Sequence, residues 1–376
     1  MAWITGIGLT PFGKQPGRTG LEWQANAARL AIRDSGVERG AIDAVLSGYT
    51  TTSAHLMPAN VLAEYLGLRP EIAFGMSVGG ATGLAMVDQA IRSIETGAAR
   101  QVLIVAGEDR ASGQSNETSM RTLSQVGHPT HEVPLGATVP AYYALLASWY
   151  LHEYGYGPVA LAPLATQMRA HAGRHEGAHF RRPITDADVA GSRPVAEPLR
   201  LLDCCPISDG GAAVVVAAEP HEGRAVRVAG TGQAHLHQHL TEATLGRFGA
   251  RQAIDRALER AGLALPEIDV AGIYDSFTVT LALLLEEIGL AEPGTSGARA
   301  QAGDFGLHGS LPLNTHGGLL SYGHSGVAGG MAHLVEVVTQ LRGEGGNRQV
   351  PGGPRHGLVH ADGGVMSAHI SAVLEV

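Results

Sequence analysis

The chain has 376 residues, of which 44% are hydrophobic and 16% charged, so it can bury a large core in one large or two modest domains. The formal net charge of −9 and the lack of Lys/Arg clusters exclude a nucleic-acid surface, because phosphate binding needs clustered positive charge. No apolar run reaches membrane-spanning length and the N-terminus lacks a signal-peptide pattern, so we expect a cytoplasmic protein without membrane contact. Cys204 and Cys205 are adjacent and are the only cysteines, which predicts neither a disulfide framework nor a metal site.

Strands and helices are expected to alternate through the first hundred residues, because apolar runs of strand length alternate with apolar positions three or four apart. In chain order we expect a strand (2–7), a helix (21–35), a buried strand (41–49), a short helix (61–66), a helix after Gly79-Gly80 with Leu84, Val87, Ile91 and Ile94 on its apolar face, and a central strand (102–106).

The alternation is interrupted over residues 112–194, where aromatic, His and Arg residues become more frequent. This stretch is interpreted as an inserted subdomain. It contains a helix at about 141–154, whose tyrosines and tryptophan we expect to pack rather than react. A turn and a buried strand at 209–216 then end the first half.

The second half repeats the first, which predicts two mixed α/β sheets with helices between and around them. Residues 31–36, followed by an isoleucine six positions after the glycine, match residues 257–262, which are followed by an isoleucine at the same spacing. Asp209-Gly210-Gly211 is matched to Asp362-Gly363-Gly364, each interpreted as opening a closing strand. The last pair of matched segments is separated by fewer residues than the first pair, so the first half carries the additional residues.

The most distinctive segment is the glycine-rich stretch from Asn314 to Gly330, which contains His324 and leads into a helix. Glycines allow tight turns and close backbone approach, and a helix N-terminus favours an anionic or oxyanionic ligand. The spacing matches neither a dinucleotide fingerprint nor a P-loop, so no nucleotide cofactor is predicted. The helix is expected to present one apolar face, formed by Val327, Met331, Leu334, Val338 and Leu341.

Three motifs give the whole chain a resemblance to the thiolase superfamily, specifically the sterol-carrier/lipid-transfer-protein type. They are Leu201 to Gly210 (LLDCCPISDG), Tyr274 to Thr278 (YDSFT) and Gly317 to His324 (GGLLSYGH). The resemblance implies a thiolase fold with α-β-α-β-α layers. It divides the chain into an N-terminal half (1–220, with the inserted loop subdomain at about 112–194) and a C-terminal half (221–376).

Both cysteines of the family's chemistry are missing. A thiolase attacks its thioester with a cysteine at the start of a buried helix. In this sequence Gly80 takes that place, and Ala361 falls at about the position of the second family cysteine. We expect Cys204 and Cys205 to be structural, because the resemblance places them beside the turn at Asp209 rather than at either catalytic position.

The resemblance assigns catalytic roles to Tyr274, Tyr322 and His324. His324 would hold the thioester oxygen as it gains negative charge, and the two tyrosines would move protons. Which tyrosine is base and which is acid stays open. The predicted substrate-binding residues are Gly80, Asp275, Ser276, Gly323 and Gly364. His316, His333 and His360 are expected to be ordinary structural residues, and no metal ligands are predicted.

Retro-aldol cleavage needs an enolate site but no protein nucleophile, because nothing is transferred to the protein. The sequence resembles the cysteine-less, thiolase-like aldolases of steroid side-chain degradation. This implies a lyase acting on a β-hydroxyacyl-CoA, as a homodimer with a small OB-fold partner and possibly a hydratase, and without a further cofactor. Two alternatives remain, an acyltransferase with a nucleophile from elsewhere and a non-catalytic acyl-CoA or lipid carrier.

The residues that bind the CoA phosphates are not identified by the sequence. Basic residues in or beside the insertion are candidates, although solvated loop arginines would give the same pattern. They are Arg110, Arg121, Arg181 and Arg182.

Overall fold

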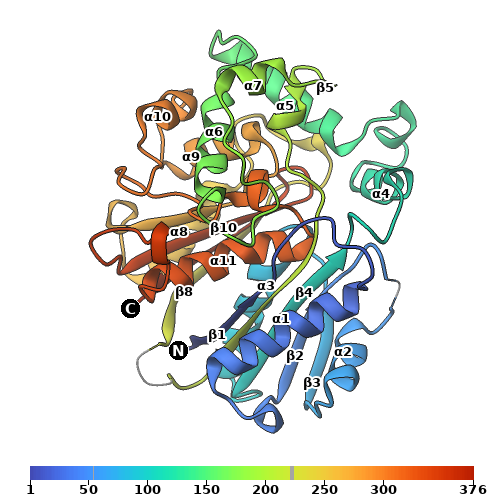
Figure 1. Ribbon diagram of the computed structural model, residues 1–376, viewed down its shortest axis with the longest axis vertical. Coiled ribbons are helices and arrows are strands. Elements are labelled where there is room, and N and C mark those ends of the chain that lie inside the picture. The colour runs from blue at the N-terminus through green and yellow to red at the C-terminus, as the bar shows by residue number, and fades with distance from the viewer. Residues whose placement is uncertain (54, 221–223) are drawn as a thin grey trace.

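The computed structural model describes residues 1–53, 55–220 and 224–376 (Figure 1). The helices are α1 (Gly20–Ser35), α2 (Pro58–Leu66), α3 (Thr82–Glu95), α4 (Asn116–Leu123), α5 (Val139–Glu153), α6 (Ala162–Ala172), α7 (Asp186–Gly191), α8 (Ala250–Ala261), α9 (Thr278–Ile288), α10 (Ser296–Ala302) and α11 (Val327–Leu341), with a π-helical turn η7 (Gly318–Tyr322). The strands are β1 (Trp3–Leu9), β2 (Ala44–Gly48), β3 (Ile72–Met76), β4 (Gln101–Asp109), β5 (Pro194–Ala196), β6 (Leu199–Arg200), β7 (Asp209–Ala217), β8 (Val226–His235), β9 (Val270–Ile273), β10 (His356–Gly363) and β11 (Ala368–Glu375). None of the described helices is both long and apolar enough to cross a membrane.

The predicted duplication is visible in the strand pairing. In the first half β2 pairs parallel with β4, which pairs antiparallel with β7, which pairs antiparallel with β1. In the second half β9, β10, β11 and β8 repeat this sequence of pairings in the same order. The expectation of two separate sheets needs correction, because β1 and β8 pair through two residues, Trp3 with Arg227 and Ile4 with Val226. The two half-sheets are therefore joined into one sheet, in the order β3-β2-β4-β7-β1-β8-β11-β10-β9.

Two helices, α3 and α11, lie between the half-sheets and contact strands of both (Figure 1). Helix α1 covers the outer face of the first half-sheet, and α8 covers the outer face of the second. This arrangement gives the expected α-β-α-β-α layers. The five residues of the expected apolar face of α11 are all buried, and so are its other ten residues. A helix enclosed on every side needs apolar or hydrogen-bonded side chains all round.

The inserted segment is larger than predicted and contains four α-helices and the short strands β5 and β6. Residues 110–208 connect β4 to β7 and contain α4 to α7, whereas residues 364–367 connect the equivalent strands β10 and β11. The predicted helix at 141–154 is confirmed as α5. The predicted boundary between halves falls in the connection from β7 to β8, where residues 221–223 lie outside the described residues.

The match between the two Asp-Gly-Gly sequences is wrong. Asp209 begins β7, but Asp362 and Gly363 end β10, and the closing strand β11 begins only at Ala368. Gly364 has a φ of 74°, which a glycine adopts without strain, so the second sequence forms the tight turn between two strands. Asp209 instead fixes neighbouring loops, because its carboxylate accepts hydrogen bonds from the backbone N–H groups of Gln15, Ala111 and Ser112.

Candidate active site

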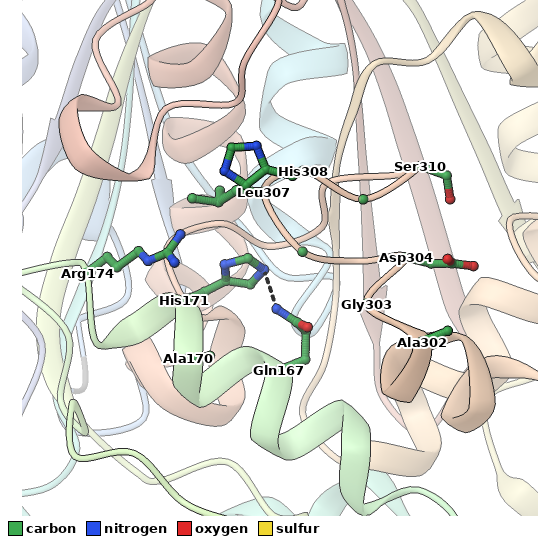
Figure 2. A pocket seen from close by; sticks show the side chains of 12 residues that line it. Gln167, Ala170, His171, Arg174, Ala302, Gly303, Asp304, Leu307, His308 and Ser310 are labelled. Atoms are coloured by element: carbon green, nitrogen blue, oxygen red, sulfur yellow. Dashed lines mark hydrogen bonds between the residues drawn. The ribbon is translucent and has the colours of Figure 1, made fainter.

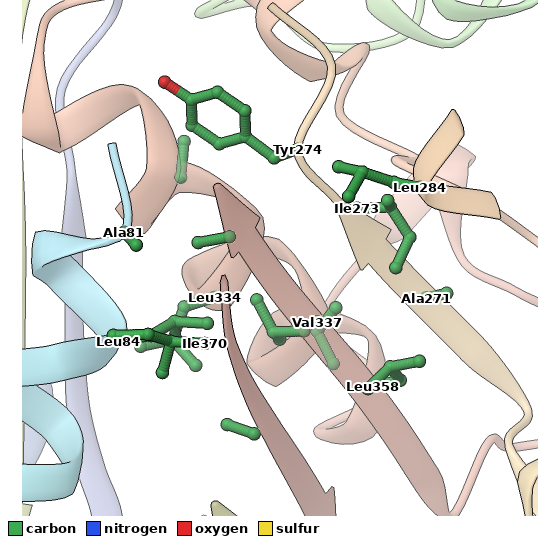
Figure 3. Packing of buried hydrophobic residues seen from close by; sticks show 14 of the residues in the cluster. Ala81, Leu84, Ala271, Ile273, Tyr274, Leu284, Leu334, Val337, Leu358 and Ile370 are labelled. Atoms are coloured by element: carbon green, nitrogen blue, oxygen red, sulfur yellow. The ribbon is translucent and has the colours of Figure 1, made fainter. Parts of the chain in front are cut away.

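Tyr274 is the first residue after β9, at the C-terminal end of a buried strand. Its backbone N–H donates to the carbonyl of His360 on β10 (3.0 Å), which fixes the start of the loop. The ring lies at the edge of the hydrophobic core, with its hydroxyl pointing away from Ile273 and Leu284 (Figure 3). That hydroxyl oxygen is 3.0 Å from Nε2 of His324. Two of the three predicted catalytic residues are therefore in direct contact.

His324 is held between η7 and α11 by the segment that precedes β7. The backbone N–H of His324 donates to the carbonyl of Pro206 (3.0 Å), and its backbone carbonyl accepts the N–H of Ser208 (3.1 Å). Gly323, with a φ of 125°, leaves no room for a side chain because a Cβ would overlap the Ser208 hydroxyl. Two of the three sequence motifs thus pack together, and their contact sets the position of the imidazole.

The protonation state of His324 follows from its surroundings. The residue keeps some solvent exposure, but burial of the ring, followed by the nearby positive charge of Arg110, lowers the pKa of His324 to about 3. The imidazole is therefore neutral near pH 7. Its Nδ1 is covered and has no hydrogen-bond partner among the described residues. If the Tyr274 hydroxyl donates to Nε2, the ring proton sits on Nδ1, where no described residue accepts it.

Gly80 faces Tyr274 across the interface of the two halves. A Cβ built on Gly80 would overlap the Tyr274 hydroxyl and would lie 2.5 Å from the carbonyl oxygen of Asp362. The space that a side chain would fill at residue 80 is thus occupied by the phenol. A nucleophilic side chain at position 80 and the observed position of Tyr274 exclude each other.

The pKa of the Tyr274 phenol is raised well above its ordinary value, chiefly by burial and secondly by the Asp362 carboxyl. The positive charge of Arg110 acts in the opposite direction. The phenol is consequently protonated near pH 7, and it can accept a proton only while it passes its own proton to His324.

Tyr322 lies apart from this centre. Its hydroxyl donates to the carbonyl of Thr10 (2.9 Å), and its ring packs against Phe12 and His175. Burial raises the pKa of the Tyr322 phenol. The structure therefore does not bring the Tyr322 hydroxyl to the pair formed by Tyr274 and His324, and its catalytic role stays a prediction.

The other predicted binding residues surround Tyr274 but make mostly internal contacts. The Asp275 carboxylate accepts N–H bonds from Leu319 (2.6 Å) and Leu320 (3.3 Å) in η7, and it lies 3.1 Å from Nε2 of His333. Ser276 pairs with the Thr280 hydroxyl at 3.2 Å. Gly364 keeps partial exposure in the turn after β10. Whether these residues contact substrate stays a prediction, and Asp275 has a clear structural task in shaping η7.

Tyr143 was not recognised in the sequence as more than a packing residue. It reaches from α5 in the inserted segment to Asp362, with its hydroxyl 3.0 Å from Oδ2, and it stacks on Phe277 with ring centroids 4.4 Å apart. His333, expected to be an ordinary structural residue, stacks against Tyr274 with centroids 6.3 Å apart. No signal in the sequence could have found these contacts, because neighbouring aromatics in a helix are equally consistent with a plain core.

The cysteines are unsuited to nucleophilic attack. Burial raises the pKa of Cys204 to about 12, and it raises that of Cys205 further. Both thiols therefore stay protonated near pH 7, which fits the structural role expected from the sequence.

A cavity of about 510 Å³ lies between α6 and the loop after α10 (Figure 2). Gln167 and His171 face it from α6, with their side-chain nitrogens 3.1 Å apart, and Arg174 and His308 lie at its rim. Neither Tyr274 nor the residues around it line this cavity. It is thus a separate feature from the centre at Tyr274.

Comparison with known proteins agrees with this architecture. Residues 232–376 match the family model described as thiolase C-terminal domain-like. The steroid side-chain-cleaving aldolase of Thermomonospora curvata is 32% identical to this chain, over 96% of this chain and 95% of its own length. The chain belongs to the thiolase superfamily.

Relatives in this superfamily carry different activities. The acetyl-CoA acetyltransferase of Methanothermobacter thermautotrophicus is 30% identical over 98% of both chains. Among solved structures, the Ltp2–ChsH2(DUF35) aldolase superposes with a TM-score of 0.83 at 30% identity, covering all of this chain and 97% of its own. Identity is therefore similar toward an aldolase and toward an acetyltransferase, and the residues of the site must distinguish them.

Proposed function

We propose that this thiolase-superfamily protein is a carbon–carbon lyase that cleaves a β-hydroxyacyl-CoA by a retro-aldol reaction. The observation that carries the proposal is the Tyr274 hydroxyl, which fills the space of a side chain at Gly80 and contacts neutral His324. Among the described residues, the thiol beside Tyr274 is that of Cys205, which stays protonated near pH 7 and is a poor nucleophile for acyl transfer. Retro-aldol cleavage needs no nucleophile, and it uses a proton carrier and an oxyanion site.

In the proposed mechanism the proton of the substrate β-hydroxyl moves to the Tyr274 oxygen while the phenol proton moves to Nε2 of His324. The oxygen's electron pair forms the ketone C=O, the Cα–Cβ bond breaks, and its electrons pass into the thioester as an enolate. The proton then returns from His324 through Tyr274 to Cα, which gives the shorter acyl-CoA. One proton leaves the substrate oxygen and one arrives at carbon, so the protein ends unchanged.

The relay resolves a difficulty with tyrosine as a base. A phenol has an ordinary pKa near 10, and burial raises that of Tyr274 further, so a free tyrosinate would be scarce at neutral pH. The phenol proton passes to His324 only while the β-hydroxyl proton arrives, so Tyr274 never has to exist as an isolated anion. Because the pKa of His324 is about 3, its protonated form is short-lived and arises only as the negative charge of the enolate develops. The role expected for His324, a hydrogen bond to the enolate oxygen, stays a prediction, because its Nδ1 is covered by protein.

A steroid thioester with a shortened side chain is the proposed substrate, by analogy with the Thermomonospora curvata relative. A homodimer and a partner of the ChsH2(DUF35) kind belong to the same proposal, the latter by analogy with the solved aldolase. Location in the cytoplasm and the lack of a further cofactor also stay predictions.

The proposal is tested by incubating the purified protein, alone and with its candidate partner, with a tertiary β-hydroxyacyl-CoA. We expect a ketone and a short acyl-CoA in equal amounts. Intact-mass spectrometry during turnover should show no acylated protein. A covalent acyl adduct would favour the acyltransferase alternative, and tight binding of acyl-CoA without turnover under every condition would favour the carrier.

A further inference from the structure

Arg110 follows directly after β4 and is buried without a partner. Its exposed fraction is 7%. No ion pair and no side-chain hydrogen bond involves its guanidinium among the described residues, and its Nε is covered from solvent. Buried charges in proteins are normally paired, because removing an ion from water is unfavourable. A largely buried guanidinium without a hydrogen-bonded partner is therefore an unusual feature that calls for a ligand.

Two carboxylates near Arg110 are partly engaged by other groups. Oε2 of Glu108 accepts the N–H and the hydroxyl of Thr51, both at 2.6 Å, while its Oε1 is covered and has no hydrogen-bond partner among the described residues. Burial raises the pKa of Glu108, and the positive charge of Arg110 acts against this rise. Asp209 is occupied by three backbone N–H groups, as described above. Among the described residues, Arg110 therefore has a carboxyl group nearby in Glu108 but no hydrogen-bonded ion-pair partner.

Arg110 lies beside the loop that carries His324. The Ser325 hydroxyl donates to the carbonyl of Glu108 (3.1 Å), which ties the end of β4 to the residue after His324. A Cβ on Gly326 would be 3.6 Å from Cδ of Arg110, so the arginine stem runs along this loop. The charge of Arg110 also lowers the pKa of His324 and opposes the rise in the pKa of Tyr274, as expected for a neighbour of both groups.

We infer that the Arg110 guanidinium binds the negatively charged thioester oxygen of the enolate that forms when the Cα–Cβ bond breaks. The inference rests on the proposed function and extends it, because it adds a catalytic residue that touches the developing anion. In that state the enolate carries one negative charge, Arg110 one positive charge, and the transferred proton is held by Tyr274 and His324.

An enolate fits this position better than the phosphates of CoA. Phosphates are permanently charged and well hydrated, and sites for them lie at the surface. A cation that is paired only when the enolate forms stabilises the transition state without tightening substrate binding, which is how charge accelerates a reaction. A guanidinium also offers several N–H donors to one oxygen and stays protonated at every working pH.

The test uses two CoA thioethers of equal length. One carries a nitroalkyl group that ionises to a nitronate, which mimics the enolate, and the other carries a neutral ketone. We expect Arg110→Gln to weaken binding of the nitronate about 10- to 100-fold, the range of a charge-assisted hydrogen bond, and to change binding of the ketone less than about threefold. Arg110→Lys should recover part of the loss. Arg251→Gln removes an exposed arginine on the outer helix α8 that pairs with Asp255, and it should change neither affinity.

Equal weakening of both ligands would overturn the inference, since it would mark Arg110 as a CoA-phosphate contact or a folding residue. Unchanged binding of both would overturn it as well. A thermal melt of each variant separates loss of fold from loss of binding. Because the assay measures binding and not cleavage, it gives an answer even if the protein proves to have no lyase activity, and absence of cleavage alone would refute only the proposed function.

Discussion

The mutual exclusion of Gly80 and Tyr274 gives a prediction that depends on geometry alone. Gly80 does not have a positive φ, so alanine is acceptable to its backbone and the cost of Gly80→Ala is purely steric. The new methyl group would overlap the Tyr274 hydroxyl and press on the Asp362 carbonyl at 2.5 Å. Movement of the segment is restricted, because Gly330 of α11 packs against the Gly80 carbonyl. We expect a loss in the free energy of unfolding of about 2 to 3 kcal/mol, the upper part of the range for overpacking.

The source of this cost is identified by a double-mutant cycle. Tyr274→Ala alone should cost about 3 to 5 kcal/mol, as for other large-to-small changes in a core. In the double variant the methyl group enters the space that the phenol has left, so part of the steric cost disappears. The Asp362 carbonyl remains, so we expect the two costs to sum to about 1 to 2 kcal/mol more than the double variant loses.

Urea denaturation of the four proteins, followed by circular dichroism, measures these differences. Gly83→Ala is the matched control. It lies three residues after Gly80, at the start of α3, and its Cβ would meet the side chain of Met331 instead of Tyr274. Its effect should add to that of Tyr274→Ala. Additivity within about 0.5 kcal/mol for the Gly80 pair would show that the phenol does not occupy this space, and the reasoning against a nucleophile at residue 80 would fail.

Other predictions concern the two tyrosines and His324. Tyr274→Phe should lower kcat for cleavage at least about 100-fold, the usual contribution of a positioned proton carrier, while Tyr322→Phe should lower it less and reduce stability by about 1 kcal/mol through loss of the bond to Thr10. A larger kcat loss for Tyr322→Phe, measured with the same thioester, would restore Tyr322 as the acid or base. For His324 the sign of the pH effect is fixed by a pKa of about 3 in the folded protein and about 6.5 in the unfolded chain. The unfolded state binds more protons between these values, so stability falls as pH drops through this window, by at most about 1.4 kcal/mol per pH unit for this one group. His324→Asn should flatten the plot of unfolding free energy against pH between 3 and 6.5, and an unchanged slope would mean that the imidazole titrates normally.

Local patterns were sufficient to predict most of the first half. Helix α1 was predicted within one residue at its start, because Thr19 and Glu22 form a capping box there and Gly36 ends the helix in the left-handed conformation. Helix α9, by contrast, was not predicted. Nine of its eleven residues are buried, so it shows an apolar run without periodicity. Such a run cannot be distinguished from a strand by its pattern alone.

The candidate site was predictable only in part, because its contacts join residues far apart in the chain. The motifs predicted that Tyr274 and His324 belong to one catalytic site, and the two side chains are in contact. The resemblance assigned Tyr322 and His324 to one catalytic site, but η7 is a π-helical turn that ends at Tyr322. Gly323 then has a φ of 125° and a ψ of 167°, which redirects the chain before His324. The two side chains therefore diverge, and no rule of helical spacing could have predicted it.

The geometry also explains why positions 80 and 274 both differ from those expected in a cysteine-dependent thiolase. A phenol at residue 274 requires a residue without a side chain at position 80, since both occupy one volume. In the proposed function, the Tyr274 hydroxyl takes the place of a thiol at residue 80. It carries a proton instead of an acyl chain. The substitution Gly80→Cys alone would place a Cβ on the Tyr274 oxygen. It should displace or unfold the site without creating an acyltransferase. A cysteine at position 80 could approach a thioester only after Tyr274 is shortened, so gain of acyl-enzyme formation should require both changes. Appearance of an acyl adduct in Gly80→Cys with Tyr274 intact, detected by intact-mass spectrometry, would contradict this dependence.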